Sequence, residues 1–113
     1  MQRPIGTLYG EARVGKHDRR DFTVPVTKED LKMTSDELRS LLGDEKAQVS
    51  YSMGYADKDF GNGFDVRVGV TLTCGQSADE VQAALTVASE LVGEALEGTV
   101  QQAKELDRAI RTS

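Results

Sequence analysis

The stretch VSYSMGYA at residues 49–56, followed by FDVRVGVTLTC at residues 64–74, decides how this chain is built. In both segments the apolar residues occupy every second position, with small or polar residues between them. Successive side chains of a β-strand point to opposite sides, so this alternation predicts two strands that each bury one side. We therefore expect a hairpin with strands at 48–55 and 64–74, joined by a glycine-rich loop.

A long helical pattern follows the hairpin. Ser77 and Glu80 have the spacing of a capping box, which satisfies free N–H groups at the start of a helix. Beyond them, apolar residues recur at steps of three and four, as one face of a helix requires. The pattern predicts a helix over 78–111, about 50 Å long at 1.5 Å per residue. Such a helix would extend beyond two strands of ten residues.

Gly93 and Gly98 lie inside this helical pattern. Each disfavours a helix interior by about 1 kcal/mol relative to alanine. They predict either a break near 93–98 or a place where another backbone comes close. Because the helix is expected to extend past its own sheet, we expect its second half to bind a further copy of the chain. The residues expected at that interface are Val92, Leu96, Val100, Ala103, Leu106 and Ile110.

The N-terminal half carries shorter signals. Residues 5–14 and 22–26 alternate as strands do, and Pro25 places the second strand at a sheet edge because proline cannot donate to a ladder. A second capping-box spacing precedes a leucine stripe and predicts a short helix near 35–42, although a helical start near Thr27 is also possible.

The expected fold is therefore α+β and forms a single domain over 1–113. A small antiparallel sheet would combine the N-terminal strands with the hairpin, accompanied by the short helix and the long C-terminal helix.

The net charge of −5 is unevenly distributed. Residues 1–20 carry five basic and two acidic side chains, whereas the rest carry nine basic and seventeen acidic ones. The acidic majority disfavours non-specific binding to nucleic acid or anionic lipid over most of the surface. A single cysteine excludes an intrachain disulfide and a Cys-based zinc site. No segment approaches the roughly 18 apolar residues of a membrane span, so we expect a cytoplasmic protein without membrane contact.

The basic segment 13–20 is the candidate anion site. Its permanent cations could hold phosphates, and arginine makes bidentate contacts to them. The same segment could instead be a solvated hairpin loop that keeps a sheet edge from aggregating. The residues expected at the site are Arg13, Lys16, His17, Arg19 and Arg20.

The loop between the hairpin strands is a candidate partner-binding loop, carried by Asp57, Asp59, Phe60 and Asn62. It resembles a calcium loop in composition, but the sixth and twelfth positions counted from Asp57 hold Asn62 and Val68. An EF-hand requires glycine and glutamate there, so we expect no metal site.

Two residues with reactive side chains have simpler interpretations. His17 could act as a general base, but no nucleophile or oxyanion device is recognisable beside it, which favours a surface histidine. Cys74 ends a strand on its apolar side, which favours a core thiol over a nucleophile. The acidic residues Glu90, Glu94 and Glu97 could imitate phosphates or simply form a solvated helix face. No nucleotide, metal or hydrolase motif occurs, so we expect neither a cofactor nor enzymatic activity.

The stretch from Tyr51 to Leu96 resembles the small hairpin-plus-helix accessory proteins of tailed-phage genomes. It runs YSMGY, an acidic Gly/Asn loop, FDVRVGVTLTC, and then a capped helix. The resemblance covers about half the chain and implies a phage origin in a host cytoplasm. It assigns no chemistry.

The sequence thus favours a non-enzymatic phage-type binding protein that self-associates through its C-terminal helix. We expect it to antagonise a host factor or defence system, either by binding a host protein or by sequestering a nucleotide signal near Arg19 and Arg20. The alternative is a nucleic-acid-binding accessory protein of phage replication or recombination.

Overall fold

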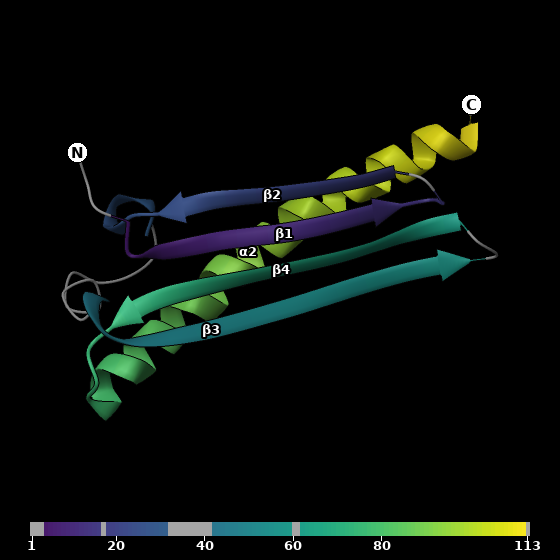
Figure 1. Ribbon diagram of the computed structural model, residues 1–113. Helices are drawn as coiled ribbons and strands as arrows, with labels where there is room; N and C mark the ends of the chain where they lie inside the picture. The colour runs from purple at the N-terminus through teal and green to yellow at the C-terminus, as the bar shows by residue number, and fades with distance from the viewer. Residues whose placement is uncertain (1–3, 17, 32–41, 60–61, 113) are drawn as a thin grey trace.

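The computed structural model of the protein describes residues 4–16, 18–31, 42–59 and 62–112. Within these ranges, four strands, a short 3-10 helix and one long α-helix follow each other (Figure 1). Their bounds are β1 (Gly6–Val14), β2 (Asp18–Val26), η1 (Lys28–Asp30), β3 (Leu42–Asp59), β4 (Asn62–Cys74) and α2 (Ala78–Thr112).

All four strands form one antiparallel sheet in the order β2-β1-β4-β3. The two hairpins, β1–β2 and β3–β4, meet where β1 pairs with β4, with Leu8 opposite Val70. A short link holds the hairpin ends together, because the Gly15 N–H donates to the Gly63 carbonyl at 2.8 Å. Both glycines have positive φ, 64° and 108°, which favours glycine over residues with a side chain.

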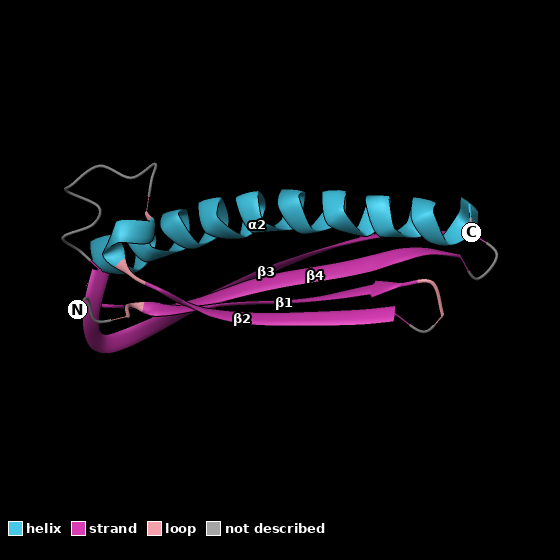
Figure 2. Ribbon diagram, turned by 90° about the horizontal axis from the view of Figure 1, so that it is seen from above, coloured by secondary structure: helices cyan, strands magenta, loops and turns pink. Residues whose placement is uncertain are grey.

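The helix α2 covers one side of the sheet, as Figure 2 shows. It packs mainly on β4 and β3, and the side chains of β4 that point toward it are fully buried. Val66, Val68, Val70 and Leu72 are each 0% exposed, because every second residue of β4 lies under the helix. From α2 itself, Ala84, Val87, Ala88 and Val92 complete a single aliphatic core.

The predicted α+β fold is confirmed, as are the second hairpin and the start of the long helix. The Ser77 hydroxyl accepts a hydrogen bond from the Glu80 N–H at 3.2 Å and donates one to the Glu80 carboxylate at 2.8 Å. Near Thr27, where a helical start was considered possible, the structure has only the one-turn 3-10 helix η1, in which the Thr27 N–H donates to the Asp30 carboxylate at 2.8 Å.

The strands are longer than predicted. Segments 15–21 and 56–63 were expected as loops because they are polar and rich in glycine, yet β2 begins at Asp18 and β3 continues to Asp59. Both extensions lie in edge strands, where polar side chains can reach water on either side. The short helix predicted near 35–42 falls on residues outside the described ranges, except Leu42, which begins β3 and is therefore not helical.

The helix is continuous, and most of it lies over the sheet, with its two ends projecting past the edge strands (Figure 1). Its 35 residues give a length of about 52 Å, close to the longest dimension of the molecule, 51 Å. The predicted break is absent, because α2 runs through both Gly93 and Gly98. The close approach of another backbone is absent as well, since a Cβ added at either glycine would meet no described atom within 4 Å.

The residues predicted for self-association instead face the chain's own sheet. Val92 and Ala103 are buried in the core, at 0% and 3% exposure. Leu96, Val100 and Leu106 are half-buried and pack against it. Only Ile110, 36% exposed, remains open at the surface. The longer strands explain the difference, because they supply sheet beneath the apolar stripe of α2 as far as Leu106.

The helix crosses the sheet diagonally and leaves two corners of its side uncovered (Figure 1). At one corner, Val24 of β2 is 45% exposed. At the opposite corner, Met53 and Tyr55 of β3 are 41% and 45% exposed, although their cross-strand partners Val68 and Val66 are buried. Apolar surface therefore remains on the helix side of both edge strands.

Candidate functional site: the open side of the sheet

The side of the sheet opposite α2 has no cover among the described residues, and we call it the open side (Figure 2). Alternation and register assign its members, since residues directly opposite in an antiparallel pair point the same way. It carries Thr7, Tyr9, Glu11 and Arg13 of β1, Arg19, Asp21, Thr23 and Pro25 of β2, Gln48, Ser50, Ser52, Gly54 and Ala56 of β3, and Asp65, Arg67, Gly69, Thr71 and Thr73 of β4.

Six charged side chains form a lattice at one end of the open side. One row across the sheet holds Asp21, Glu11 and Arg67, and the next holds Arg19, Arg13 and Asp65. Three carboxylates and three guanidinium groups share this area, so the charges of the lattice sum to zero. A polar hollow of about 150 Å³ lies between Glu11, Arg13, Asp65 and Arg67.

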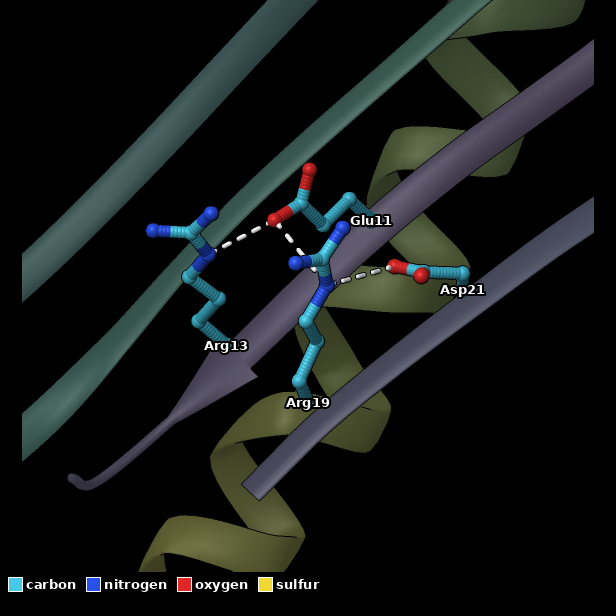
Figure 3. Close-up of polar contacts among 4 residues, drawn as sticks. All are labelled: Glu11, Arg13, Arg19 and Asp21. Carbon is cyan, nitrogen blue, oxygen red and sulfur yellow. Dashed lines mark hydrogen bonds and ion pairs between the residues drawn. The ribbon is translucent and has the colours of Figure 1, made fainter. Parts of the chain in front are cut away.

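Short contacts hold part of this lattice in place (Figure 3). Arg13 Nε donates to Glu11 Oε1 at 2.6 Å, and Arg19 Nε lies 3.4 Å from the same oxygen. Arg19 Nε also donates to Asp21 Oδ1 at 3.3 Å. The pKa of Arg19 is raised above its usual value by the hydrogen bond to Asp21 and by the negative charges of Asp21 and Glu11. Arg67 has no ion pair with another described residue.

Tyr9 lies at the centre of the open side, next to the charged lattice. It is 41% exposed, and its ring lies over Gly69, directly opposite on β4. A Cβ at Gly69 would collide with that ring, so the glycine makes the space that the tyrosine occupies. The result is an aromatic side chain held against the sheet with part of its surface open to solvent.

The other end of the open side is uncharged and rich in hydroxyl groups. Thr7, Thr71 and Thr73 line a shallow hollow of about 430 Å³, together with Gln48 and Tyr9. The Ser50 and Thr71 hydroxyls lie 3.4 Å apart. The Thr73 hydroxyl already donates to the Ile5 carbonyl at 3.0 Å. The open side therefore offers arginines, one tyrosine and hydroxyls along a continuous surface.

The predicted anion site is divided between the two sides of the sheet. Arg13 and Arg19 belong to the open side, where carboxylates neutralise them. Arg20 points the other way, because it follows Arg19 in a strand. Lys16 lies in the turn, and His17 lies outside the described residues. The structure therefore does not bring these arginines together as one cluster, because strand alternation applies where a loop was expected, and anion binding stays a prediction.

Arg20 lines a separate groove between β2 and the second half of α2. This groove has a volume of about 170 Å³ and an apolar floor that includes Phe22, Ala103 and Leu106. Asp18, Asp21, Thr99 and Gln102 also border it. Small-molecule sites usually measure about 300 to 1,000 Å³. The groove therefore has room for one side chain of a partner rather than for a nucleotide.

The predicted partner loop is largely strand. Asp57 and Asp59 belong to β3 and Asn62 to β4, whereas Phe60 lies outside the described residues. Asp57 borders an open hollow with Lys104 and Arg108 near the end of α2. The predicted core position of Cys74 is confirmed, because its side chain is 0% exposed. Glu90, Glu94 and Glu97 are exposed on the outer face of α2.

Tyr9, Glu11, Asp65 and Arg67 were not among the predicted site residues. The signal that could have found them was present, since all four occupy alternate positions of their strands. What the sequence did not show was that β1 and β4 are neighbours, which brings the four side chains together.

Within the described residues, no three His, Cys, Asp or Glu side chains are grouped as metal ligands. The described part of the chain also contains no helix with the length and apolar character needed to cross a membrane. Comparison with protein-family models, with curated proteins and with solved structures found no match to this chain.

Proposed function

We propose that this chain is a non-enzymatic binding protein that docks a protein partner on the open side of its sheet. The observation that carries the proposal is Tyr9, an exposed aromatic side chain held over Gly69 beside three arginines. Tyrosine and arginine are among the residues most enriched at the positions that dominate protein interfaces. A ring already fixed in place loses little conformational freedom when a partner covers it.

The charges favour a protein partner over nucleic acid. Phosphate binding relies on cations that release counterions, and its strength grows with the number of phosphates that they neutralise. In the lattice, Glu11 and Asp21 already neutralise Arg13 and Arg19, and the six charges cancel. A surface of mixed charge instead matches a partner protein with the opposite arrangement, because complementary charges set the register of the complex.

The partner that we propose is a host factor, which the chain would antagonise by occupying its surface. The resemblance of the stretch from Tyr51 to Leu96 to small phage accessory proteins supports this step. Sequestration of a nucleotide has less support, because Arg19 and Arg20 point to opposite sides of β2 and the groove beside Arg20 is small.

Affinity capture from a host lysate tests the proposal with two matched charge reversals. Arg67→Glu changes the open side, and Arg20→Glu changes the other side by the same charge; both arginines are exposed. We expect a protein retained by the unaltered chain and by Arg20→Glu to be lost with Arg67→Glu and with Tyr9→Ala. Equal retention by all variants, while their melting temperatures agree, would remove the open side as the docking surface.

A nucleic-acid-binding function is the second candidate, because Tyr9, Arg13, Arg19 and Arg67 share one side of the sheet. Aromatic stacking and arginine contacts are how sheet surfaces hold single strands. This candidate predicts oligonucleotide binding at low salt that falls steeply as salt rises. It also predicts that Arg67→Glu abolishes binding and that Arg20→Glu does not. Absence of binding to single- and double-stranded oligonucleotides at low salt would exclude it.

A further inference from the structure

The two edges of the sheet are built very differently. The edge strand β2 contains Asp18, Arg19, Arg20 and Asp21, and Pro25 near its end. Charged residues and proline are the usual protection of an edge, because they oppose pairing with another strand. The other edge strand, β3, has charged residues only at its two ends, at 44–46 and 57–59, and neither charge nor proline from residue 47 to residue 56, where the sequence is AQVSYSMGYA. In the described part of the chain, no strand pairs with its outer edge.

Exposed apolar side chains accompany this unprotected edge. Met53 and Tyr55 lie on the helix side of β3 and are 41% and 45% exposed. The ring of Tyr55 stacks on buried Phe64, with 5.8 Å between ring centroids, and this contact fixes its position. An uncharged strand edge with unpaired backbone groups, next to an apolar strip, is a surface that favours pairing with another strand.

We propose that a second copy of this chain pairs with β3 in an antiparallel arrangement, joining two sheets into one of eight strands. Antiparallel pairing of β3 with itself has a two-fold axis through the seam, so the same surface serves both copies. This two-fold axis is perpendicular to the sheet. Both α2 helices therefore lie on the same side of the joined sheet. The apolar strips beside them then meet at the seam.

Self-complementarity is the reason for choosing a second copy over an unrelated strand. A two-fold axis at Met53 places Tyr51 opposite the Tyr55 position of the second copy and Met53 opposite its own equivalent. It also sets the small residues Ser52 and Gly54 against each other on the open side. With this axis the uncharged residues 50–56 meet themselves and residues 47–49 lie opposite 57–59, so Asp57, Lys58 and Asp59 face uncharged residues and no like charges oppose each other. An axis at Ser52 instead of Met53 is also compatible with the apolar pattern. In that register odd-numbered residues of one copy still lie opposite odd-numbered residues of the other, so the apolar side chains stay together on the helix side.

The edge pairing is independent of the open-side docking proposed above. It places the seam at the β3 edge, whereas Tyr9 lies on β1 and Arg67 on β4. It also differs from self-association through the apolar stripe of α2, which the chain's own sheet already covers. Pairing at this edge leaves the apolar stripe of each α2 in the core of its own copy.

Light scattering after size exclusion tests the proposal on two matched variants. Met53→Lys and Val24→Lys each place a charge on the helix side of an edge strand, at residues of 41% and 45% exposure. At about 50 µM, far above the dissociation constant of a standard interface, the unaltered chain and Val24→Lys are expected at twice the 12.3 kDa chain mass. Met53→Lys is expected as a monomer, with self-association about 100-fold weaker or more, since it would bury an unpaired charge.

Cysteine cross-linking gives a second measurement that does not depend on a disruptive charge. The native Cys74 is buried, so a new cysteine at the seam would be the accessible thiol among the described residues. Only the residue at the two-fold axis can link efficiently to itself, so either Met53→Cys or Ser52→Cys should form a covalent dimer under mild oxidation, and Val24→Cys should not.

Three results would overturn the edge pairing. The first is that the unaltered chain is a monomer. This includes the case in which its β3 edge binds a different protein and the Met53→Lys variant no longer binds that protein. The second is a dimer that Met53→Lys and Val24→Lys affect equally. The third is a dimer in which neither position 52 nor position 53 cross-links. Arg67→Glu and Tyr9→Ala should leave the dimer mass unchanged, so failure of the open-side proposal and failure of the edge pairing are separate observations.

Discussion

On the side of the sheet that faces α2, Val66, Val68 and Val70 of β4 are 0% exposed. On the other side of the same strand, Arg67 is exposed and Thr71 is half-buried. The same strand therefore contributes buried apolar side chains to the core under α2 and polar side chains to the open side. The comparison teaches that folding depends on one set of alternate residues, which leaves the other set available for binding.

Introducing an aspartate on each side of β4 gives the largest expected difference in the free energy of unfolding. Val68→Asp places a carboxylate in the core with no partner, which costs roughly 4 kcal/mol or more and approaches the whole stability of a small domain. Thr71→Asp, on the open side, should cost less than about 1 kcal/mol. Urea denaturation followed by circular dichroism measures both. Similar midpoints for the two variants would contradict the burial of only one side of the sheet under α2.

Two glycine–aromatic pairs allow the same comparison at neighbouring positions, because one pair lies on the helix side of the sheet and the other on the open side. Gly10 makes room for Phe22 on the helix side, and Gly69 makes room for Tyr9 on the open side. We expect Gly10→Ala to cost about 2 to 3 kcal/mol, since Phe22 is confined between sheet and helix. Gly69→Ala should cost about 1 kcal/mol, because the Tyr9 ring can swing into solvent.

Thermal unfolding of the two alanine variants measures this difference. The double variant Gly69→Ala, Tyr9→Ala serves as a control, since it lacks the Tyr9 ring with which the new alanine Cβ would collide. A greater loss for Gly69→Ala than for Gly10→Ala would mean that Tyr9 is held more rigidly than Phe22.

The start of α2 offers a smaller test, because this helix is the cover of the buried side. Ser77→Ala removes the acceptor for the Glu80 N–H and should lower the free energy of unfolding by about 1 kcal/mol. Ser89→Ala is the matched control within the same helix. Its hydroxyl donates to the Thr86 carbonyl, so its loss should change stability by less than about 0.5 kcal/mol. Chemical denaturation of both variants would show whether the cap matters more than the interior serine.

The parts of the fold that depend on local patterns could be predicted from the sequence. The alternation from Phe64 to Cys74 and the capping pair of Ser77 and Glu80 predicted β4 and the start of α2 closely. The pairing of β1 with β4 has no local signal, because it joins strands that lie far apart along the chain. Segment lengths were also underestimated, since polar residues in edge strands have the composition of loops.

The candidate site was predicted less well than the fold. Arg19 and Arg20 were taken together as one cationic cluster, yet adjacent strand residues point to opposite sides. The contact of Glu11 with Arg19 could not be predicted either, because it depends on the register between β1 and β2. Composition indicated which residues are basic, whereas only the sheet determines which of them share a surface.

Gly93 and Gly98 give the smallest expected effect and the only stabilising one. Both are exposed in the middle of a continuous helix, and a Cβ at either position meets no described atom within 4 Å. Nothing in the described structure requires glycine at these positions, so Gly93→Ala and Gly98→Ala should each raise the free energy of unfolding by about 0.5 to 1 kcal/mol. Denaturant titrations of the single and double variants measure this, and the two effects should add because the side chains do not touch. A loss of stability would contradict the exposed placement of these residues. A gain in stability with a loss of partner capture would instead show that the outer face of α2, and not only the open side of the sheet, belongs to the binding surface.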